Sequence, residues 1–283
     1  MTTPIHPAAT VVVLRDTPGG LEVFLVRRHQ AIAFMAGAHV FPGGRVDDGD
    51  HEADGDWCDG VAGAQHNMPG VDLKEALAFQ VAAARELFEE AGVLVARTAR
   101  GEFVALTADA DRERFASHRA DLNASRRSFH DIIAGERLRL ALDALVPFAH
   151  WVTPPIDIKR FDTRFFATRV PPHQTPSHDA HEATESLWIA PRLAIAAATR
   201  DELLLPPPTW ATLRELERFD SVEAALTWAA THRIERREPI VTLENGVRKI
   251  VLPGDPTMPE REPVAYETRF VMADGRWRPE PAE

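Results

Sequence analysis

Short apolar runs near the N-terminus give way to helically spaced apolar residues further along the chain. Residues 10–16 and 21–29 are rich in β-branched and aromatic residues and are separated by Pro-Gly-Gly, which predicts two strands joined by a tight turn. Residues 73–91 are dominated by Ala, Leu, Glu and Arg, and Gly92 follows them. This composition predicts a helix that ends at the glycine.

The later part of the chain alternates between predicted helices and strands. Residues 109–143 predict two or three helices with a break at Gly135, and residues 45–72, rich in Asp, Gly and His, predict a surface segment. Further strands are expected at 93–96, 148–152 and 164–170, helices at 191–200 and 209–231, and hairpins at 240–252 and 268–277. Helices and strands alternate, which is typical of an α/β protein.

Composition narrows the class of protein. A hydrophobic fraction of 45% with 27% charged residues is that of a folded globular chain rather than a disordered one. The formal net charge of -11 argues against a nucleic-acid partner, because binding phosphates along a nucleic acid requires a basic surface. The one cysteine, Cys58, excludes an internal disulfide and suits a reducing compartment. With no basic leader and no long apolar run, we expect a cytoplasmic protein without a membrane partner.

The predicted helix at 73–91 carries the candidate chemistry. Glu86, Glu89 and Glu90 are three and four positions apart, so their carboxylates share one face of a helix. Carboxylates grouped in this way are either a solvated acidic face or ligands of a divalent cation. Phe-Pro-Gly-Gly at 41–44 adds two glycines where a close backbone approach is expected.

Together these segments resemble the Nudix hydrolase family. Residues 85–93 match the second half of the Nudix box, Arg-Glu-apolar-x-Glu-Glu-x-Gly-apolar, and residues 41–44 resemble its opening. The box glycine and arginine are 14 positions apart in the family, whereas Gly44 and Arg85 are 41 apart, which implies an insertion of 27 residues. The segment at 45–72 is about that size.

The split box resembles the branch that includes the mammalian peroxisomal coenzyme A diphosphatase. Gly37 and the following Phe-Pro-Gly-Gly fit the pattern Arg-x₃-Gly-x₃-Phe-Pro-Gly-Gly of coenzyme A-cleaving members, with Ala33 in place of the arginine. In the family, a glutamate stands eight positions before the box arginine. Here that position is Leu77, and Glu75 is a candidate substitute.

The resemblance implies roles for individual residues. Glu86, Glu89, Glu90 and the Gly44 carbonyl would bind Mg²⁺, for which Mn²⁺ is a possible substitute. Arg85 would hold the carboxylates in place, and Glu86 is either a ligand or the base for the attacking water. A further acidic group is expected ahead of the Trp188 strand, with Glu182 the first choice and Glu185 the second.

Three further residues are candidates for substrate contacts: Arg28, His39 and Arg160. Arg28 belongs to the polar edge that ends the second predicted strand, and His39 precedes the glycine-rich opening. Arg160 begins a segment, Arg-Phe-Asp-Thr, that resembles others in this branch. It would bind a phosphate or form a structural ion pair with a carboxylate.

The fold implied is a Nudix α/β/α sandwich with a mixed sheet. We expect a Nudix domain at 1–200, with insertions at 45–72 and about 109–143, and a C-terminal helical and hairpin extension at 201–283. The expected activity is hydrolysis of a nucleoside diphosphate linked to another moiety, with coenzyme A or acyl-coenzyme A as the leading substrate and ADP-ribose or a dinucleotide as the alternative. A nucleotide-sensing module without catalysis, an interaction protein and a homodimer are the other possibilities.

Overall fold

The computed structural model describes residues 4–29, 36–157, 159–178, 183–244, 246–258 and 262–280. A mixed sheet with strand order β10-β2-β1-β9-β8-β11 forms its centre, with β3 paired to β2 and β4 paired to β1. β1 runs parallel to β9, and its neighbours β2 and β4 are antiparallel to it. The central strands are β1 (Ile5–Thr17), β2 (Gly20–Arg28), β3 (His39–Val40), β4 (Gly43–Arg45), β8 (Val146–Val152), β9 (Arg160–Arg169), β10 (Ala183–Ile189) and β11 (Arg236–Arg237).

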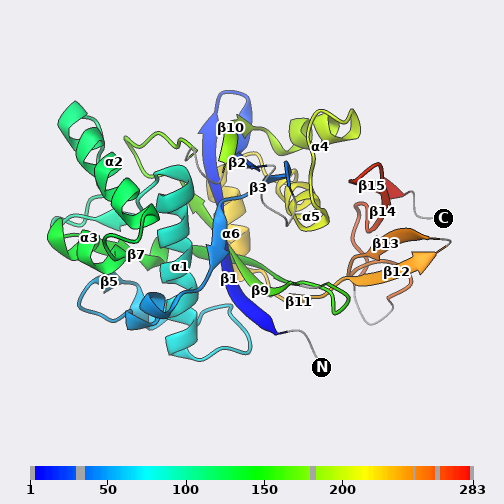
Figure 1. Ribbon diagram of the computed structural model, residues 1–283, viewed down its shortest axis with the longest axis horizontal. Coiled ribbons are helices and arrows are strands. Elements are labelled where there is room, and N and C mark those ends of the chain that lie inside the picture. Colours follow the sequence, from blue (N-terminus) through cyan, green and yellow to red (C-terminus); the bar gives the residue numbers. More distant parts are fainter. Residues whose placement is uncertain are drawn as a thin grey trace.

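Helices cover both faces of this sheet (Figure 1). On one side lie α1 (Leu73–Ala91), α2 (Asp109–Asn123) and α3 (Phe129–Gly135), and on the other lie α4 (Pro191–Thr199), α5 (Pro207–Leu216) and α6 (Val222–Thr231). β1 explains why both faces are covered. Val11 and Val13 pack with α1, whereas Val12 and Leu14 pack with α5 and α6, so the continuous apolar run has two buried faces. The predicted mixed-sheet sandwich is confirmed.

Two smaller sheets flank the sandwich. A three-stranded sheet with order β5-β7-β6 lies on the α1 side and consists of β5 (Cys58–Asp59), β7 (Arg139–Ala141) and β6 (Ala96–Arg97). A four-stranded sheet at the far side contains the two predicted C-terminal hairpins, β12 (Ile240–Glu244) with β13 (Val247–Val251) and β14 (Arg269–Ala273) with β15 (Arg276–Glu280). Among the described residues, none of the helices has the length and apolar character that a membrane crossing needs.

Two local predictions were wrong. Residues 136–143 were expected to be helical, but they contain β7 and a 3₁₀ turn (Leu142–Ala144), because Leu140 pairs with Cys58 and Ala96 from distant segments. Residues 209–231 form two helices rather than one. Ser221 caps the second, and its side chain accepts a hydrogen bond from the Ala224 amide.

The segment at 45–72 is partly buried, contrary to the expected surface position. It contains two 3₁₀ helices (Asp48–Glu52 and Val61–Gly63), and Trp57 and Met68 join the core beneath α1. Its Asn67 reaches the C-terminal part of the chain: the side-chain amide donates to the carbonyls of Ala229 and His232 and accepts from the Ile234 amide at 3.1 Å. The insertion and the segment after α6 are therefore held together, and the boundary at residue 200 stays a prediction.

Replacing Asn67 by alanine is expected to lower the free energy of unfolding by about 2 kcal/mol, because three backbone groups lose their partner. Urea denaturation measures the change. Glu52→Ala, at an exposed position of the same insertion, is the control. Equal stabilities of the two variants would show that Asn67 does not hold the extension.

Candidate metal centre

The candidate centre lies at the C-terminal end of α1. The helix starts at Asp72, which caps it by accepting from the Glu75 amide at 2.9 Å, and ends at Gly92, whose positive φ of 65° suits a residue without a side chain. These two ends determine which residues fall in the last turns. Glu86, Glu89 and Glu90 all line one cavity of about 1290 Å³ there.

Arg85 connects the acidic groups of this site. Its guanidinium donates to Glu86 and Glu89, at 2.9 Å each, and to the Arg45 carbonyl at 2.8 Å. On its other side it donates twice to Asp50, at 2.9 and 2.8 Å. Burial alone would lower the pKa of Arg85, but its hydrogen bond with Asp50 and the charges of Asp50, Glu86 and Glu89 raise it above the ordinary value.

Asp50 is a candidate functional residue that the sequence pattern did not identify. It is 2% exposed, and it lies six residues after Gly44. In the family's box the glutamate stands eight positions before the arginine and therefore six after the glycine. Counting forward from Gly44 finds Asp50 at that position, whereas counting back from Arg85 crosses the insertion and finds Leu77. Glu75 does not substitute, because it forms the capping box with Asp72.

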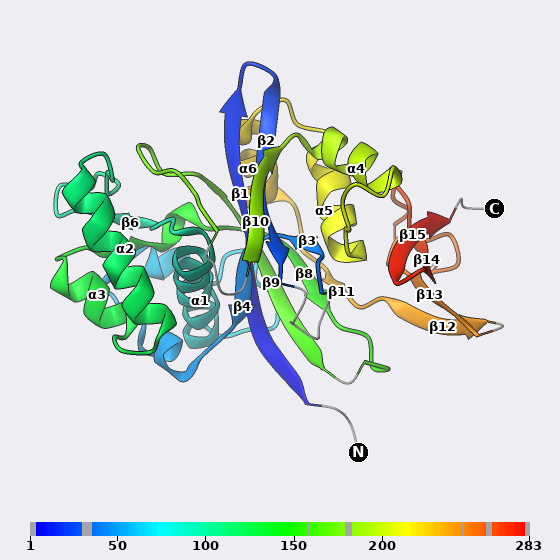
Figure 2. The ribbon, with the colours of Figure 1, turned by 45° about the horizontal axis from the view of Figure 1, so that its top comes forward.

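The two glycines before the insertion permit two close approaches. β4 pairs with β1, which brings Gly43 and Gly44 beside Thr10 and Ala9, and the same strand lies beside α1 (Figure 2). A Cβ on Gly43 would lie 2.3 Å from the Ala9 carbonyl oxygen. A Cβ on Gly44 would lie 2.4 Å from the Glu86 carboxylate. The Gly43 amide also donates to Glu90 at 2.9 Å, so this turn shapes the site directly.

Gly43→Ala and Gly44→Ala are expected to have different effects. The first places a methyl group against fixed backbone, so it lowers the unfolding temperature. The second displaces only the flexible Glu86 side chain, so the protein stays folded while kcat falls about tenfold or more. Thermal unfolding and steady-state kinetics of both variants check this. Full activity in Gly44→Ala would contradict a working position of Glu86 beside Gly44.

The donor chemistry of the site fits a hard divalent cation. Its three carboxylates offer oxygen ligands, which Mg²⁺ prefers, and Gly44 lies beside one of them, Glu86. Within the described ranges, no three His, Cys, Asp or Glu side chains are grouped closely enough to hold a metal together, and Glu86 and Glu89 both bond to Arg85. Burial raises the pKa of Glu89, and Arg85 only partly opposes that shift. A cation beside Glu89 would favour its charged form.

The structure does not gather the three predicted substrate residues at this cavity. Arg28 ends β2, and its amide donates to the Ala38 carbonyl at 2.9 Å. His39 is 4% exposed and bonded to Leu204, and burial lowers its pKa to about 4, so it is neutral at physiological pH. Arg160 forms an ion pair with Glu238 at 2.7 Å. None of the three is among the described residues that line the cavity.

Of the two acidic residues predicted ahead of Trp188, the structure describes only Glu185. Glu182, the first choice, lies outside the described residues. Glu185, the second, lies on β10 with a half-exposed side chain and approaches Arg27 at 3.5 Å.

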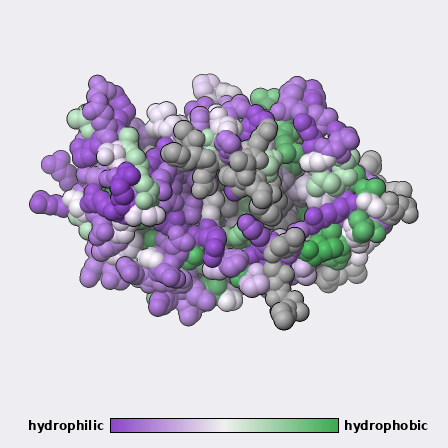
Figure 3. All heavy atoms as spheres, viewed as in Figure 1, coloured by the Kyte–Doolittle hydropathy of each residue, from purple (hydrophilic) through white to green (hydrophobic). Residues whose placement is uncertain are grey.

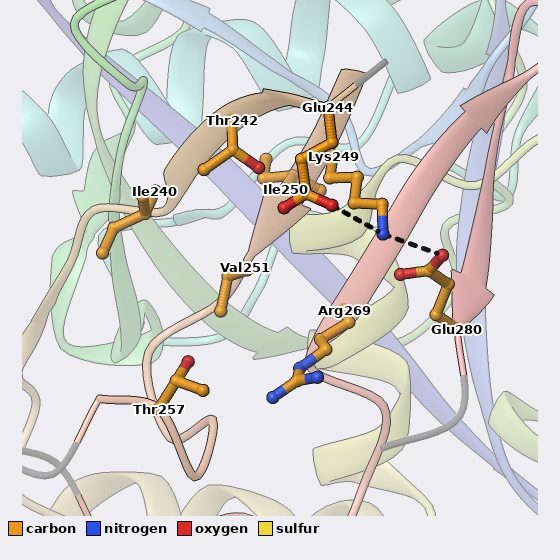
Figure 4. A pocket seen from close by; sticks show the side chains of 9 residues that line it. All are labelled: Ile240, Thr242, Glu244, Lys249, Ile250, Val251, Thr257, Arg269 and Glu280. Carbon is orange, nitrogen blue, oxygen red and sulfur yellow. Dashed lines mark ion pairs between the residues drawn. The ribbon is translucent and has the colours of Figure 1, made fainter. Parts of the chain in front are cut away.

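A second hollow, of about 600 Å³, lies on the C-terminal sheet (Figure 4). Lys249 points between Glu244 and Glu280 there, at 3.1 and 3.5 Å. Its acidic groups thus already have a cationic partner. Of the two hollows, the one at the end of α1 is therefore the candidate metal centre.

Known proteins resemble this chain in sequence and in fold. The family model described as the NUDT19 Nudix domain matches residues 62–218. The human acyl-coenzyme A diphosphatase NUDT19 is 31% identical over 277 residues, which span 83% of this chain and 72% of that protein. The corresponding Xenopus laevis protein is 25% identical, over 95% of this chain and 79% of its own. A crystal structure of a NUDIX hydrolase from Alicyclobacillus acidocaldarius superposes with a TM-score of 0.67 at 29% identity, covering 80% of this chain and 97% of that one.

Proposed function

The chain belongs to the NUDT19 Nudix family and is a hydrolase of diphosphate linkages, and from this premise we propose that it cleaves coenzyme A or acyl-coenzyme A at α1 with Mg²⁺. Hydrolysis would give adenosine 3′,5′-bisphosphate and a phosphopantetheine. Both the substrate and the residues that act on it are the proposal.

One observation carries the assignment of the site. Glu86, Glu89 and Glu90 line the same cavity, and Arg85 joins the first two to Asp50 through a buried network. Aligning like charges in this way is unfavourable unless a cation joins them. Arg85 bonds three of the four carboxylates, and the Gly43 amide bonds the fourth, Glu90.

Nudix hydrolases in general need divalent metals, and Mg²⁺ is the ion we propose, with Mn²⁺ as a substitute. Glu86, Glu89, Glu90 and the Gly44 carbonyl would hold it. Bound there, the cation would screen the diphosphate charge and lower the pKa of the attacking water.

The protein's own groups would fix the geometry of the reaction. Arg85 holds Glu86 and Glu89, and the Gly43 amide holds Glu90, so the carboxylates are oriented before substrate arrives. Glu86 would either bind the cation or accept the proton of the attacking water. Retained Mn²⁺ binding with lost turnover in Glu86→Gln would identify it as the base, and loss of both would identify it as a ligand.

Names of relatives support the substrate proposal. Acyl-coenzyme A diphosphatases of human and Xenopus laevis match most of this chain. Glu182 as an additional acid, Arg28, His39 and Arg160 as substrate contacts, a homodimer and a cytoplasmic location also stay predictions.

Mg²⁺-dependent turnover of coenzyme A, ADP-ribose, NADH and a diadenosine polyphosphate tests the proposal, with products identified by chromatography. We expect coenzyme A to have the highest kcat/KM and to release adenosine 3′,5′-bisphosphate. A higher kcat/KM for ADP-ribose or a dinucleotide would overturn the substrate assignment. Binding of a nucleotide without cleavage of any substrate would overturn the proposed reaction.

A further inference from the structure

The wall of the cavity opposite the carboxylates is basic. α2 and the turn after it contribute three arginines to the lining, Arg112, Arg119 and Arg126, while α1 contributes the three glutamates. The surface over α2 and α3 is largely hydrophilic (Figure 3). The helical insertion therefore faces the metal centre with cationic groups.

The spacing of residues on α2 explains why two of these arginines, Arg112 and Arg119, share a side. Phe115 and Leu122 are the buried residues of the helix, and Phe115 meets Phe88 of α1 edge-on with ring centres 6.5 Å apart. Arg112 and Arg119 lie seven residues apart on α2, which returns to nearly the same helix face, and Arg126 lies in the turn after the helix ends at Asn123. The packing of α2 on α1 thus turns Arg112 and Arg119 towards the cavity, and Arg126 reaches it from the turn that follows.

Arg119 connects these arginines to the metal helix. Its Nε donates to the Glu89 carbonyl oxygen at 2.8 Å. A Cβ on Gly92 would lie 3.0 Å from its guanidinium, so the glycine that ends α1 leaves room for this contact. The guanidinium of Arg119 is thereby held beside the backbone of a proposed metal ligand.

Arg112 and Arg126 are open to solvent. Their side chains are 53% and 61% exposed, and their carboxylate partners, Asp109 and Asp121, both belong to α2. Exposed local ion pairs of this kind are weak, so a phosphate can compete for the guanidinium groups. By contrast, Arg114 points to Glu136 beside α3, at 3.0 Å.

We infer that Arg112, Arg119 and Arg126 form a basic wall, and that this wall binds a phosphate monoester of the substrate away from the diphosphate that is cleaved. The inference rests on the proposed function, because the proposed function places the diphosphate against the glutamates of α1. Guanidinium groups bind phosphate oxygens through paired, charge-assisted hydrogen bonds. A nucleoside diphosphate with an additional phosphate on its ribose is the substrate class that suits both the glutamates of α1 and the arginines opposite them. The helical insertion would then select for that phosphate.

Coenzyme A and 3′-dephospho-coenzyme A differ by this one group and form a matched pair of substrates. For the wild-type enzyme, we expect kcat/KM to be higher for coenzyme A. In Arg112→Gln/Arg126→Gln, the ratio of the two kcat/KM values should fall about tenfold, with kcat/KM for the dephospho compound little changed. Arg192→Gln on the exposed face of α4 controls for the loss of a surface charge.

A binding measurement separates this inference from the proposed function. Calorimetry in EDTA compares adenosine 3′,5′-bisphosphate with AMP for the wild type and the double variant, and requires no turnover. Tighter wild-type binding of the bisphosphate, lost in the variant, supports phosphate binding by the basic wall even if coenzyme A is not cleaved. An unchanged preference in the variant, or none in the wild type, overturns phosphate binding by the basic wall even if coenzyme A is a good substrate.

Discussion

Replacing Glu89 and Glu90 together by glutamine is expected to reduce kcat for diphosphate hydrolysis about 1000-fold or more. Both side chains line the cavity at the end of α1, and glutamine keeps their size while removing the negative charges that would bind the cation. Metal catalysis contributes several kcal/mol to transition-state stabilisation, and each 1.36 kcal/mol is a factor of ten in rate. Steady-state kinetics at saturating Mg²⁺ measure the loss.

Glu102→Gln/Glu113→Gln is the matched control, because it removes two exposed carboxylates that do not line the cavity. Its kcat should stay within twofold of the wild-type value. Circular dichroism and thermal unfolding of both double variants establish that they are folded. A folded Glu89→Gln/Glu90→Gln enzyme with wild-type kcat would refute the assignment of these carboxylates.

Asp50→Asn is expected to have the second-largest effect. Asparagine fills the same space but cannot balance the buried Arg85, which forms two hydrogen bonds with Asp50. Arg85 also holds Glu86 and Glu89, so their orientation should loosen. Losing such a supporting group typically costs about 10- to 100-fold in activity or metal affinity. Breaking one partner of a buried ion pair also destabilises a fold by about 3–5 kcal/mol.

Two variants distinguish positioning from general destabilisation. Asp50→Glu restores the residue type of the family's box, so it should recover activity and metal affinity to within a few-fold. Asp48→Asn changes an exposed neighbour in the same 3₁₀ helix and should behave as wild type. Assays are run below the unfolding temperature of each variant. Normal Mn²⁺ affinity in folded Asp50→Asn would show that Asp50 does not position the metal ligands.

The fold was predictable wherever local pattern and tertiary contacts agree. The helix at residues 73–91 begins and ends as expected, because Asp72 caps its start and Gly92 adopts the left-handed conformation at its end. β1 and β2 followed from their apolar runs, and both C-terminal hairpins from their turn residues. β7 was missed, because its short ladder depends on segments far away in the chain.

The site was predictable in its carboxylates but not in its surroundings. Helical spacing alone places Glu86, Glu89 and Glu90 on one face. The insertion lies between Asp50 and Arg85, so counting back from Arg85 does not reach Asp50. Counting forward from Gly44 identifies it. The contribution of α2 to the cavity depends on how Phe115 packs against Phe88, a long-range contact that spacing does not reveal.

Titration of Mn²⁺ followed by electron paramagnetic resonance tests the central claim, that the carboxylates of α1 form the metal centre. The wild-type protein should bind Mn²⁺, and added Mg²⁺ should displace it. Folded Glu89→Gln/Glu90→Gln should lose this binding. Equal Mn²⁺ binding by the wild type and the double variant would place the metal elsewhere and contradict the account.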